Sequence, residues 1–580
     1  MPGADASEIT RFKKFRAIQT SEFQNSGKKN NKRNEQYVRR LPASRLFDFL
    51  PSVSKRYLED EVTEEEIVSG VGLQMVFSST KSSVVIGFLS NYLINITVDR
   101  CSSYTVNRVY DPLYAPSKTY YVTINNPLSD CVIDGLAGVT AVSGEGQGLT
   151  SFNLSTLTDL EIVVASYTNL TAASINSSKI SPTITTLICE NNNLAGLNLT
   201  GFPNLKILRL NDSNLTGILN LSMLSNLEEI SCRTNPNLQG IIITGLTKLR
   251  IYECLENAFT DTVFDFTAFP DLEKLSIGGG NIGANSITRL NVSGLLKLEK
   301  LEIYYSNSLT FTNLNITNLP NLKNLFFTYA RGLNGVFNAL VYPKLETLGF
   351  VTAGLTGIII NGLTKLRQFY CADIPTFTPT SFDLTAFPDL ETVFIQGINL
   401  TGINVSGLLK LKYFNFYNNN IVRANMNISN LPNLIQFDSS GNPVGGGTLD
   451  LSVYPKLQYI GCSSCNLSNI DITGLLDLVK LICSYNLFAI SSLDLTSFTK
   501  LEILQCSALG LNFSNINITG LTKLKQINCE NNKISTADMN TILRNLPNRT
   551  GLTAGTCTVN PQTPALGTLD SVTAKNWVVS

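Results

Sequence analysis

The sequence predicts a solenoid of the α/β type, predominantly β in content, in which about 18 turns of chain stack into a curved rod. An apolar pattern recurs at spacings of 21 to 26 residues between Val139 and Ile534. The chain has 580 residues, well above the length of one ordinary domain. Only 15% of the residues are charged and 43% are apolar, so uncharged Asn, Ser and Thr must cover much of the surface.

Residues 1–70 are expected to form a charged docking arm, partly disordered or helical. The run SGKKNNKRNEQYVRR has no apolar periodicity, which is typical of a segment that stays disordered until it finds a partner. Docking into a larger assembly and a merely solvated tail both fit; nucleic-acid binding fits less well, because few rings interleave with the charges. The candidate docking residues are Arg11, Lys13, Lys14, Arg16, Lys28, Lys29, Lys32, Arg33, Arg39 and Arg40.

Residues 71–130 read as a small β adaptor domain between the arm and the solenoid. Apolar and polar residues alternate there between turn residues, as in SYTVNRVYDPLYAPSKTYYVTI. The most apolar long window, Ser82 to Val98, is interrupted by Asn91 and Asn95 and is shorter than the ~20 residues that cross a bilayer. We expect buried β structure here and no membrane span.

Residues 131–534 carry the repeats, whose pattern is LxxLx(L/I/F/C)xx(N/other)x(L/I), numbered here from its first apolar residue. The spacings lie within the about 20 to 29 residues of leucine-rich repeats. In Leu205 to Leu210 the apolar positions 1, 4 and 6 predict a short strand that points positions 4 and 6 inward and pairs in parallel with its neighbours. Position 1 falls at Val139, Leu160, Ile184, Leu205, Leu227, Leu249, Leu272, Leu298, Leu322, Leu345, Leu366, Leu390, Leu411, Leu434, Leu457, Leu478, Leu501 and Leu524.

A hydroxyl recurs five residues before position 1, where it can satisfy backbone groups of the turn away from the sheet. Leu340 and Asn361 are exceptions. The hydroxyl residues are Thr200, Ser222, Thr244, Thr267, Ser293, Thr317, Thr385, Ser406, Ser429, Ser452, Thr473, Thr496 and Thr519.

Cysteine has a structural interpretation, because eight of the twelve occupy position 6, where other repeats have Leu, Ile or Phe. Cys465 fills the Asn position of its repeat, and no CxxC pairs with a second one. We therefore expect small buried hydrophobes, with no disulfide and no metal. The position-6 residues are Cys189, Cys232, Cys254, Cys371, Cys462, Cys483, Cys506 and Cys529.

The segments TLICENNNLAGLNLTGFPNL (186–205) and KQINCENNKI (525–534) resemble the Cys-bearing leucine-rich repeats common in Bacteroidetes proteins and in phages of those bacteria. The tail resembles the cap that closes such arrays: a helix-like STADMNTILRNLP (535–547), then residues 558–580 with Trp577 near the end. The resemblance covers about residues 131–580, with 535–580 as the C-terminal cap, and implies a scaffold rather than a function.

A longer period shows that the array grew by duplication of a five-repeat block. The turns are kept between copies while the strand face varies, as in LEKLSIGGGNI (272–282) against LETVFIQGINL (390–400). The matched segments are 243–250 with 360–367, 264–273 with 382–391, 291–298 with 404–411, 315–322 with 427–434, and 341–345 with 453–457.

Aromatic residues gather at positions 3, 5, 7 and 8, which are expected to face solvent. Rings with polar handles on a rigid sheet suit glycan or protein recognition. Strand propensity and cross-strand stacking explain the same rings without a ligand. The candidate ligand-binding residues are Tyr304, Tyr305, Phe326, Tyr329, Tyr370, Phe394, Tyr413, Tyr417, Tyr459 and Tyr485. Position 2 is mostly charged with mixed sign, as at Lys206 and Glu228, and is expected to be a solvated rim.

The composition argues against an enzyme and against a charge-driven partner. There is no His, which removes Ser-His-Asp and Cys-His catalysis and His-ligated metals, and no cofactor is expected. Lys plus Arg and Asp plus Glu both number 44, so no net charge favours nucleic acid or an acidic membrane.

The sequence thus favours a non-enzymatic structural or recognition protein. The first hypothesis is a phage virion appendage of the fibre or decoration type, made in the host cytoplasm, docked to other virion proteins by its N-terminus and binding a host surface glycan or protein through the repeat face. No apolar h-region follows MPGADASEITRFKKFRAIQ, which fits that hypothesis. The alternatives are a bacterial surface adhesin and an intracellular interaction scaffold or effector; homo-oligomerisation stays open.

Overall fold

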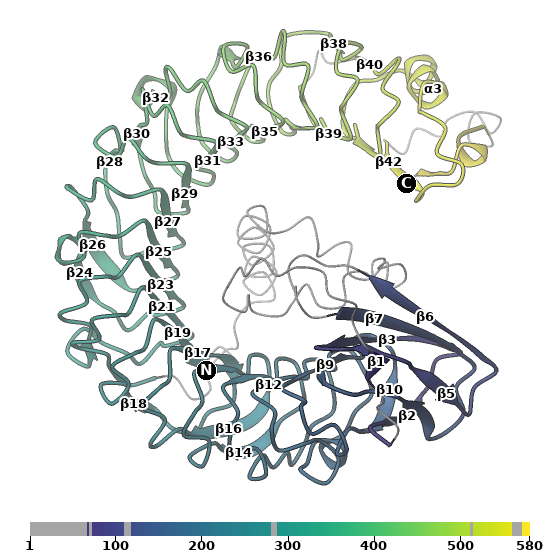
Figure 1. Cartoon of the computed structure of the whole chain (residues 1–580). Coiled ribbons are helices and arrows are strands. Elements are labelled where there is room, and N and C mark those ends of the chain that lie inside the picture. Colours follow the sequence, from purple (N-terminus) through teal and green to yellow (C-terminus); the bar gives the residue numbers. More distant parts are fainter. Residues whose placement is uncertain are drawn as a thin grey trace, which may run out of the picture. The chain divides into compact units, whose positions relative to one another are not determined.

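The computed structural model describes residues 67–68, 72–109, 118–279, 287–510, 514–559 and 571–579. The candidate docking residues between Arg11 and Arg40 lie outside these ranges. The chain divides into two compact units. Unit 1 comprises residues 1–298, 304–306 and 313–318, and unit 2 comprises residues 299–303, 307–312 and 319–580. Figure 1 shows that repeated turns of chain build both units, each turn with a strand on its inner side.

In unit 1 the repeats contribute one strand each to a parallel main sheet. Neighbouring strands pair with position 3 opposite position 3, as at Thr186, Ile207 and Glu229, so the predicted parallel pairing is confirmed. The strands are β9 (Val139–Ser143), β11 (Ile162–Val164), β12 (Thr186–Ile188), β13 (Ile207–Arg209), β15 (Glu229–Ser231), β17 (Ile251–Asn257) and β19 (Lys274–Gly279).

Unit 2 has a parallel main sheet of the same construction and register. Most of β21 (Lys300–Tyr304) belongs to this unit. The further strands are β23 (Asn324–Thr328), β25 (Thr347–Val351), β27 (Gln368–Ala372), β29 (Thr392–Gln396), β31 (Tyr413–Asn415), β33 (Gln436–Asp438), β35 (Tyr459–Gly461), β37 (Lys480–Ile482), β39 (Ile503–Gln505), β41 (Gln526–Asn528), β42 (Gly555–Thr558) and β43 (Trp577–Val579).

The core of each turn consists of the residues at positions 1, 4 and 6. Leu205, Leu208 and Leu210 each have 0% of their surface exposed, because alternation along the strand sends positions 4 and 6 inward. All eight position-6 cysteines are likewise buried, as predicted, and all twelve thiols are free. The chain therefore has the predicted predominantly β solenoid fold of leucine-rich repeat proteins.

Short back strands occupy the side of each turn away from the main sheet (Figure 1). They pair in parallel as groups of two or three. In unit 1 these are β14 (Thr216–Asn220) with β16 (Asn237–Ile242), and β18 (Val263–Asp265), β20 (Arg289–Asn291) and β22 (Leu314–Asn315). In unit 2 they are β24 (Gly335–Asn338) with β26 (Leu355–Ile359); β28 (Ser381–Asp383), β30 (Gly402–Asn404) and β32 (Met426–Asn427); β34 (Thr448–Asp450) with β36 (Asn469–Asp471); and β38 (Ser492–Asp494) with β40 (Asn515–Asn517). Single 3₁₀ turns lie at η2 (Ala172–Ser174), η3 (Ala339–Val341) and η4 (Arg423–Asn425).

The hydroxyls that precede position 1 act differently from the prediction. Ser222 donates both its backbone N–H and its hydroxyl to Oδ1 of Asn220, two residues earlier, instead of bonding backbone groups directly. The same Asn or Asp turn recurs in later repeats, as at Asp383 with Thr385. Even Leu340, which lacks a hydroxyl, donates its N–H to Asn338. In these turns the Asn or Asp oxygen is therefore the acceptor, and the hydroxyl donates to it; Ile242 and Ile359 take its place in two other repeats.

Residues 75–153 form antiparallel structure within unit 1. One sheet has the order β10 (Leu149–Asn153), β2 (Met75–Ser79), β8 (Cys131–Asp134) and β5 (Thr97–Asp99). In the other, β6 (Ser103–Val109) pairs with β7 (Lys118–Asn125), β7 with β3 (Ser83–Ser90), and β3 with β9 of the main sheet. β1 (Ile67–Val68) pairs with β4 (Leu93–Ile94). Since β3 occupies the free edge of β9, this region shields the first rung.

The C-terminal segment of unit 2 contains the helix expected within residues 535–547. It is α3 (Thr536–Arg544), and the Ser535 side chain accepts a hydrogen bond from the Asp538 N–H at its start. Trp577 is buried on β43 and donates its ring N–H to the Pro547 carbonyl over 2.8 Å. No helix in the described part of the chain has the length and apolarity needed to cross a bilayer.

Candidate recognition face

The ten candidate rings lie on or beside main strands, but five of them are not exposed as the sequence suggested. Tyr305, Phe326, Tyr329, Tyr370 and Phe394 keep at most 6% of their surface accessible. Tyr304, Tyr413, Tyr417 and Tyr459 are half-buried, and Tyr485 is exposed at 58%. The expectation of exposure was therefore wrong for half of the set.

The physical reason for the burial is stacking from strand to strand. Phe326 lies over Gly349, where a Cβ atom would collide with its ring, and so reaches Tyr370 on the second strand along, with ring centroids 5.2 Å apart. Tyr370 packs against Phe394 at 6.2 Å, and Phe394 meets Tyr417 edge to face at 5.5 Å. Such contacts stabilise neighbouring strands by about 0.5–1.5 kcal/mol each beyond their area burial.

Tyr305, Tyr329 and Tyr485 share position 8, which sequence reasoning treated as part of the face. In the structure position 8 adopts a left-handed backbone, with φ of 48°, 53° and 58° at these three residues. The residue belongs to the turn that ends the strand, so its ring direction depends on that turn. Tyr485 points its ring to solvent, whereas Tyr305 and Tyr329 do not.

One accessible part of the unit 2 face is a patch on and beside β31, β33, β35 and β37 that we call the tyrosine patch: Tyr413, Tyr417, Asp438, Tyr459 and Lys480. The Tyr459 hydroxyl donates to Asp438 Oδ2 over 2.9 Å, and the Lys480 ammonium lies 4.9 Å from the Tyr459 ring centroid. Burial, followed by the Asp438 charge, raises the pKa of Tyr459. The patch thus presents phenol rings, one carboxylate and one ammonium together.

Gly461 explains how Asp438 reaches Tyr459. The carboxylate of Asp438 lies over Gly461 on the next strand, in the space that a Cβ would fill. The other carboxylate oxygen accepts the Ser440 N–H over 2.9 Å, which fixes the rotamer. Sequence reasoning missed both residues, although a Gly at position 5 beside an acid at position 5 of the preceding repeat was a readable signal.

The unit 1 face carries a polar network that the sequence analysis did not single out. Glu190 accepts a hydrogen bond from Asn211 over 2.7 Å, and Arg233 pairs with Glu253 over 2.9 Å. Burial raises the pKa of Glu190, and burial together with the Glu190 charge raises the pKa of Glu145 to about 7. Glu145 and Glu190 both stand at position 7, which would have placed them on one face.

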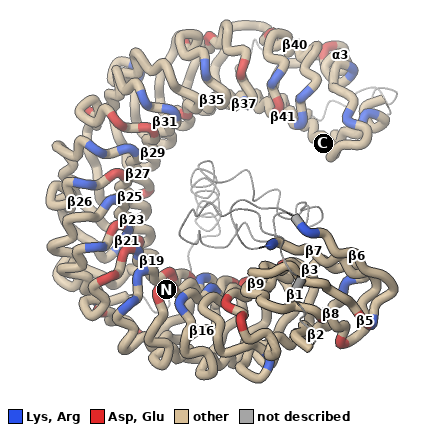
Figure 2. The backbone as a smooth tube through the Cα atoms, in the orientation of Figure 1, with Lys and Arg blue, Asp and Glu red and all other residues tan. Residues whose placement is uncertain are grey.

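The charged rim at position 2 forms ion pairs of alternating sign between neighbouring repeats. In unit 1 Arg250 lies between Glu228 at 3.7 Å and Glu273 at 2.9 Å. In unit 2 Lys412 pairs with Glu391 over 2.9 Å. Figure 2 shows both signs interspersed along the turns. These partners are largely solvated, so each pair contributes little to stability.

Within the described ranges, no group of three His, Cys, Asp or Glu side chains is placed to hold a metal ion. The buried cysteines have a packing role. Cys465, in the Asn position of its repeat, donates its thiol to the Ser439 carbonyl over 3.2 Å. Burial raises the pKa of the Cys465 thiol to about 11.

The chain has the solenoid fold of leucine-rich repeats. No protein-family model and no curated protein matches the sequence. Among solved structures, it is similar to YopM from Yersinia enterocolitica (17% identity, 76% of this chain and 91% of that one, TM-score 0.42). It is also similar to the functional domain of InlJ from Listeria monocytogenes (19%, 66% and 76%, 0.37) and to the leucine-rich repeat protein LIC12759 from Leptospira interrogans (18%, 69% and 92%, 0.38).

Proposed function

We propose that this chain is a non-enzymatic recognition protein that binds a glycan or protein through the main-sheet face of unit 2, centred on the tyrosine patch. The observation that carries the proposal is the placement of half-exposed phenol rings beside Asp438 and Lys480 on consecutive strands. Rings held by a rigid sheet lose little conformational entropy on binding, and their hydroxyls supply specificity.

The finer proposal is a phage virion appendage that docks to other virion proteins through the candidate docking residues of the N-terminal arm and binds a host surface glycan or protein. It is supported by the resemblance of the Cys-bearing repeats and by the basic composition of residues 11–45. Mass spectrometry of purified particles tests it. Presence of the chain, with cross-links from residues 1–130 to another virion protein, is expected; absence from particles overturns the virion role.

The recognition role is tested by binding of the full chain to susceptible cells. Replacing Tyr413 and Tyr417 together by Ala should weaken binding about tenfold or more, because the loss of two buried contact rings commonly costs several kcal/mol. Tyr167→Ala is the matched control, since Tyr167 is an exposed tyrosine at position 8 of unit 1. Equal binding by the patch variant and the wild type, at equal thermal stability, would contradict the proposed face.

A further inference from the structure

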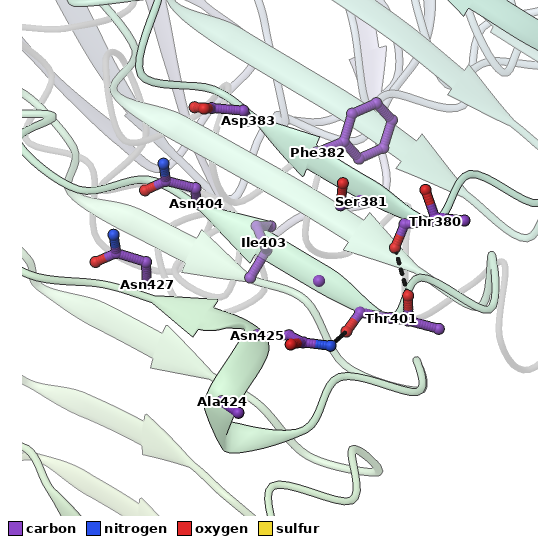
Figure 3. Close-up of a pocket in the computed structure, with 11 residues that line it drawn as sticks. Thr380, Ser381, Phe382, Asp383, Thr401, Ile403, Asn404, Ala424, Asn425 and Asn427 are labelled. Carbon is purple, nitrogen blue, oxygen red and sulfur yellow. Dashed lines mark hydrogen bonds between the residues drawn. The ribbon is translucent and has the colours of Figure 1, made fainter.

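A hollow of ≈ 490 Å³ lies on the back strands of unit 2 (Figure 3). Its volume falls within the about 300–1,000 Å³ typical of small-molecule sites. It spans β28, β30 and β32 and is lined mainly by short polar side chains. Its lining includes Ser381, Asp383, Gly402, Asn404, Asn425 and Asn427.

The hollow exists because Gly402 has no side chain. Ser381 of β28 pairs with Gly402 of β30. On the other side of β30, Met426 of β32 pairs with Ile403, so Asn425, the residue before Met426, lies beside Gly402. A Cβ on Gly402 would lie 3.3 Å from the Ser381 Cβ and 3.4 Å from the Asn425 Cβ. The floor between these two side chains is therefore backbone and Ile403, which is buried.

The walls offer hydrogen-bonding groups whose directions are fixed by the local turns. Asp383, Asn404 and Asn427 end the three strands side by side, and each uses Oδ1 to accept the hydroxyl two residues on. Hydrogen bonds from Thr385 lower the pKa of Asp383, so this carboxylate is an ionised acceptor at neutral pH. The Asn425 amide is oriented by donating to the Thr401 carbonyl over 3.1 Å.

The chain contains an internal comparison, because the first copy of the duplicated block has the matching strands β18, β20 and β22 with different residues in the places of Ser381 and Gly402. In the matched segments Asp265, Asn291 and Asn315 correspond to Asp383, Asn404 and Asn427. Arg289 stands where the second copy has Gly402, and Val263 stands where it has Ser381. The Arg289 charge contributes to lowering the pKa of Asp265, whereas no cation acts on Asp383 in this way.

We propose that this hollow binds a neutral saccharide residue of an oligosaccharide, at a site separate from the tyrosine patch. Amides, hydroxyls and a carboxylate fixed along a shallow groove match the vicinal hydroxyls of a sugar. The ionised Asp383 disfavours acidic sugars, because no cationic side chain lines the hollow. The site goes beyond the proposed function and does not depend on it.

The test compares the full chain with variants that exchange residues between the two copies, on a panel of immobilised neutral and acidic oligosaccharides. The wild type should retain a subset of neutral oligosaccharides. Gly402→Arg, which installs the residue of the first copy, should weaken this binding at least about tenfold. Ser381→Val removes one hydroxyl without filling the hollow, so it should weaken oligosaccharide binding less than Gly402→Arg does. It replaces Gly402→Arg as the test variant if that change lowers thermal stability.

The reverse change, Arg289→Gly, should create a second hollow and raise the calorimetric stoichiometry for the retained neutral oligosaccharide from one site towards two. The variant with Tyr413 and Tyr417 changed to Ala should keep wild-type binding, which separates this site from the tyrosine patch. The proposal is overturned if the wild type retains no neutral oligosaccharide, or if both Gly402→Arg and Ser381→Val bind as the wild type does. Preference for acidic oligosaccharides also overturns it.

Discussion

Position 8 of the repeats shows how one backbone angle, rather than one residue type, defines the turn after each main strand. Its φ is positive in every predicted repeat except the one that begins at Leu272. Among the repeats with positive φ, glycine occupies position 8 only at Gly146, Gly397 and Gly441; in the others the residue is Asn, Asp, Thr, Tyr, Glu, Ser or Ala. Non-glycine residues pay about 1–2 kcal/mol for this conformation, so the fold carries strain at many of its turns.

Ala508→Gly is therefore expected to stabilise the protein by about 0.5–1 kcal/mol. The change relieves the left-handed strain at φ 49°, and the greater freedom of Gly in the unfolded chain cancels part of the gain. Gly441→Ala is the reciprocal control and should destabilise, because a Cβ there would also collide with the Asn418 side chain. Denaturation midpoints in urea measure both, and a lower midpoint for Ala508→Gly would refute the strain argument.

In several repeats position 9 carries a buried Asn that joins neighbouring repeats. Asn419 accepts the N–H groups of Ile398 and Leu400 and donates to the carbonyls of Ile395 and Phe416, all at 2.9–3.2 Å. Asn442, Asn486 and Asn532 make the same kind of contacts in later repeats. Short turns that lack a regular ladder thus have their backbone groups satisfied by a side chain.

Asn419→Ala should cost about 2–4 kcal/mol, because it leaves several buried backbone groups without a partner. Asn420→Ala is the matched control: it is the next residue in the run 418–420 and is exposed. Its expected effect is within about 0.5 kcal/mol. Hydrogen exchange of the Ile398 and Leu400 amides reports the local effect. Equal exchange rates in the two variants would argue against the role of the Asn419 side chain in holding these N–H groups.

At the level of the element, most back turns contain an Asn or Asp that accepts a backbone N–H and commonly a hydroxyl as well. Hydrogen bonds lower the pKa of three of these acids. The main donor to Asp265 is the Thr267 hydroxyl, and the main donor to Asp383 is the Thr385 hydroxyl. For Asp471 the main donor is the Thr473 N–H. A lowered folded-state pKa gives stability that is present above the unfolded value of about 3.9 and is lost as the pH falls through the folded value.

The stability of these turns should accordingly decline below about pH 4. Because the acids are solvated, the loss at each turn should be small. Replacing Asp265, Asp383 and Asp471 together by Asn, the residue that neighbouring repeats use at this place, should flatten that part of the profile while keeping the acceptor. Thermal unfolding midpoints of the variant and the wild type between pH 3 and 7 measure the difference. Identical profiles would show that these acids do not couple turn stability to pH.

The elements were predictable from the sequence to different degrees, for physical reasons. Positions 1, 4 and 6 determine both burial and register, so the main strands follow from the spacing of residues such as Leu205, Leu208 and Leu210. Exposure of rings was not predictable in this way, because Phe326 is buried through the absence of a side chain at Gly349 and through contact with Tyr370. The hollow at Gly402 likewise depends on which residue faces it on the adjacent strand.

At the scale of the whole molecule, a solenoid is stabilised by contacts between adjacent turns, so its local stability is a sum of intrinsic and nearest-neighbour terms. Buried thiols occur at intervals along the chain from Cys189 to Cys529, so the reactivity of each can report the local stability of its repeat. Burial raises the pKa of Cys131 to about 11 and of Cys483 to about 12. A thiol reagent at neutral pH therefore reacts with these groups only where the turn that holds them opens.

In the native protein only Cys101, which is half-exposed, should react rapidly among the twelve thiols. Asn419→Ala should then accelerate labelling of Cys371 and Cys462, which lie two repeats away on either side of the altered repeat, while Cys189 in unit 1 keeps its wild-type rate. Mass spectrometry of alkylated peptides gives each rate separately. Because coupling in a one-dimensional array decays over neighbouring repeats, equal acceleration at Cys189 would mean that the chain opens as a single cooperative body and would contradict nearest-neighbour stabilisation.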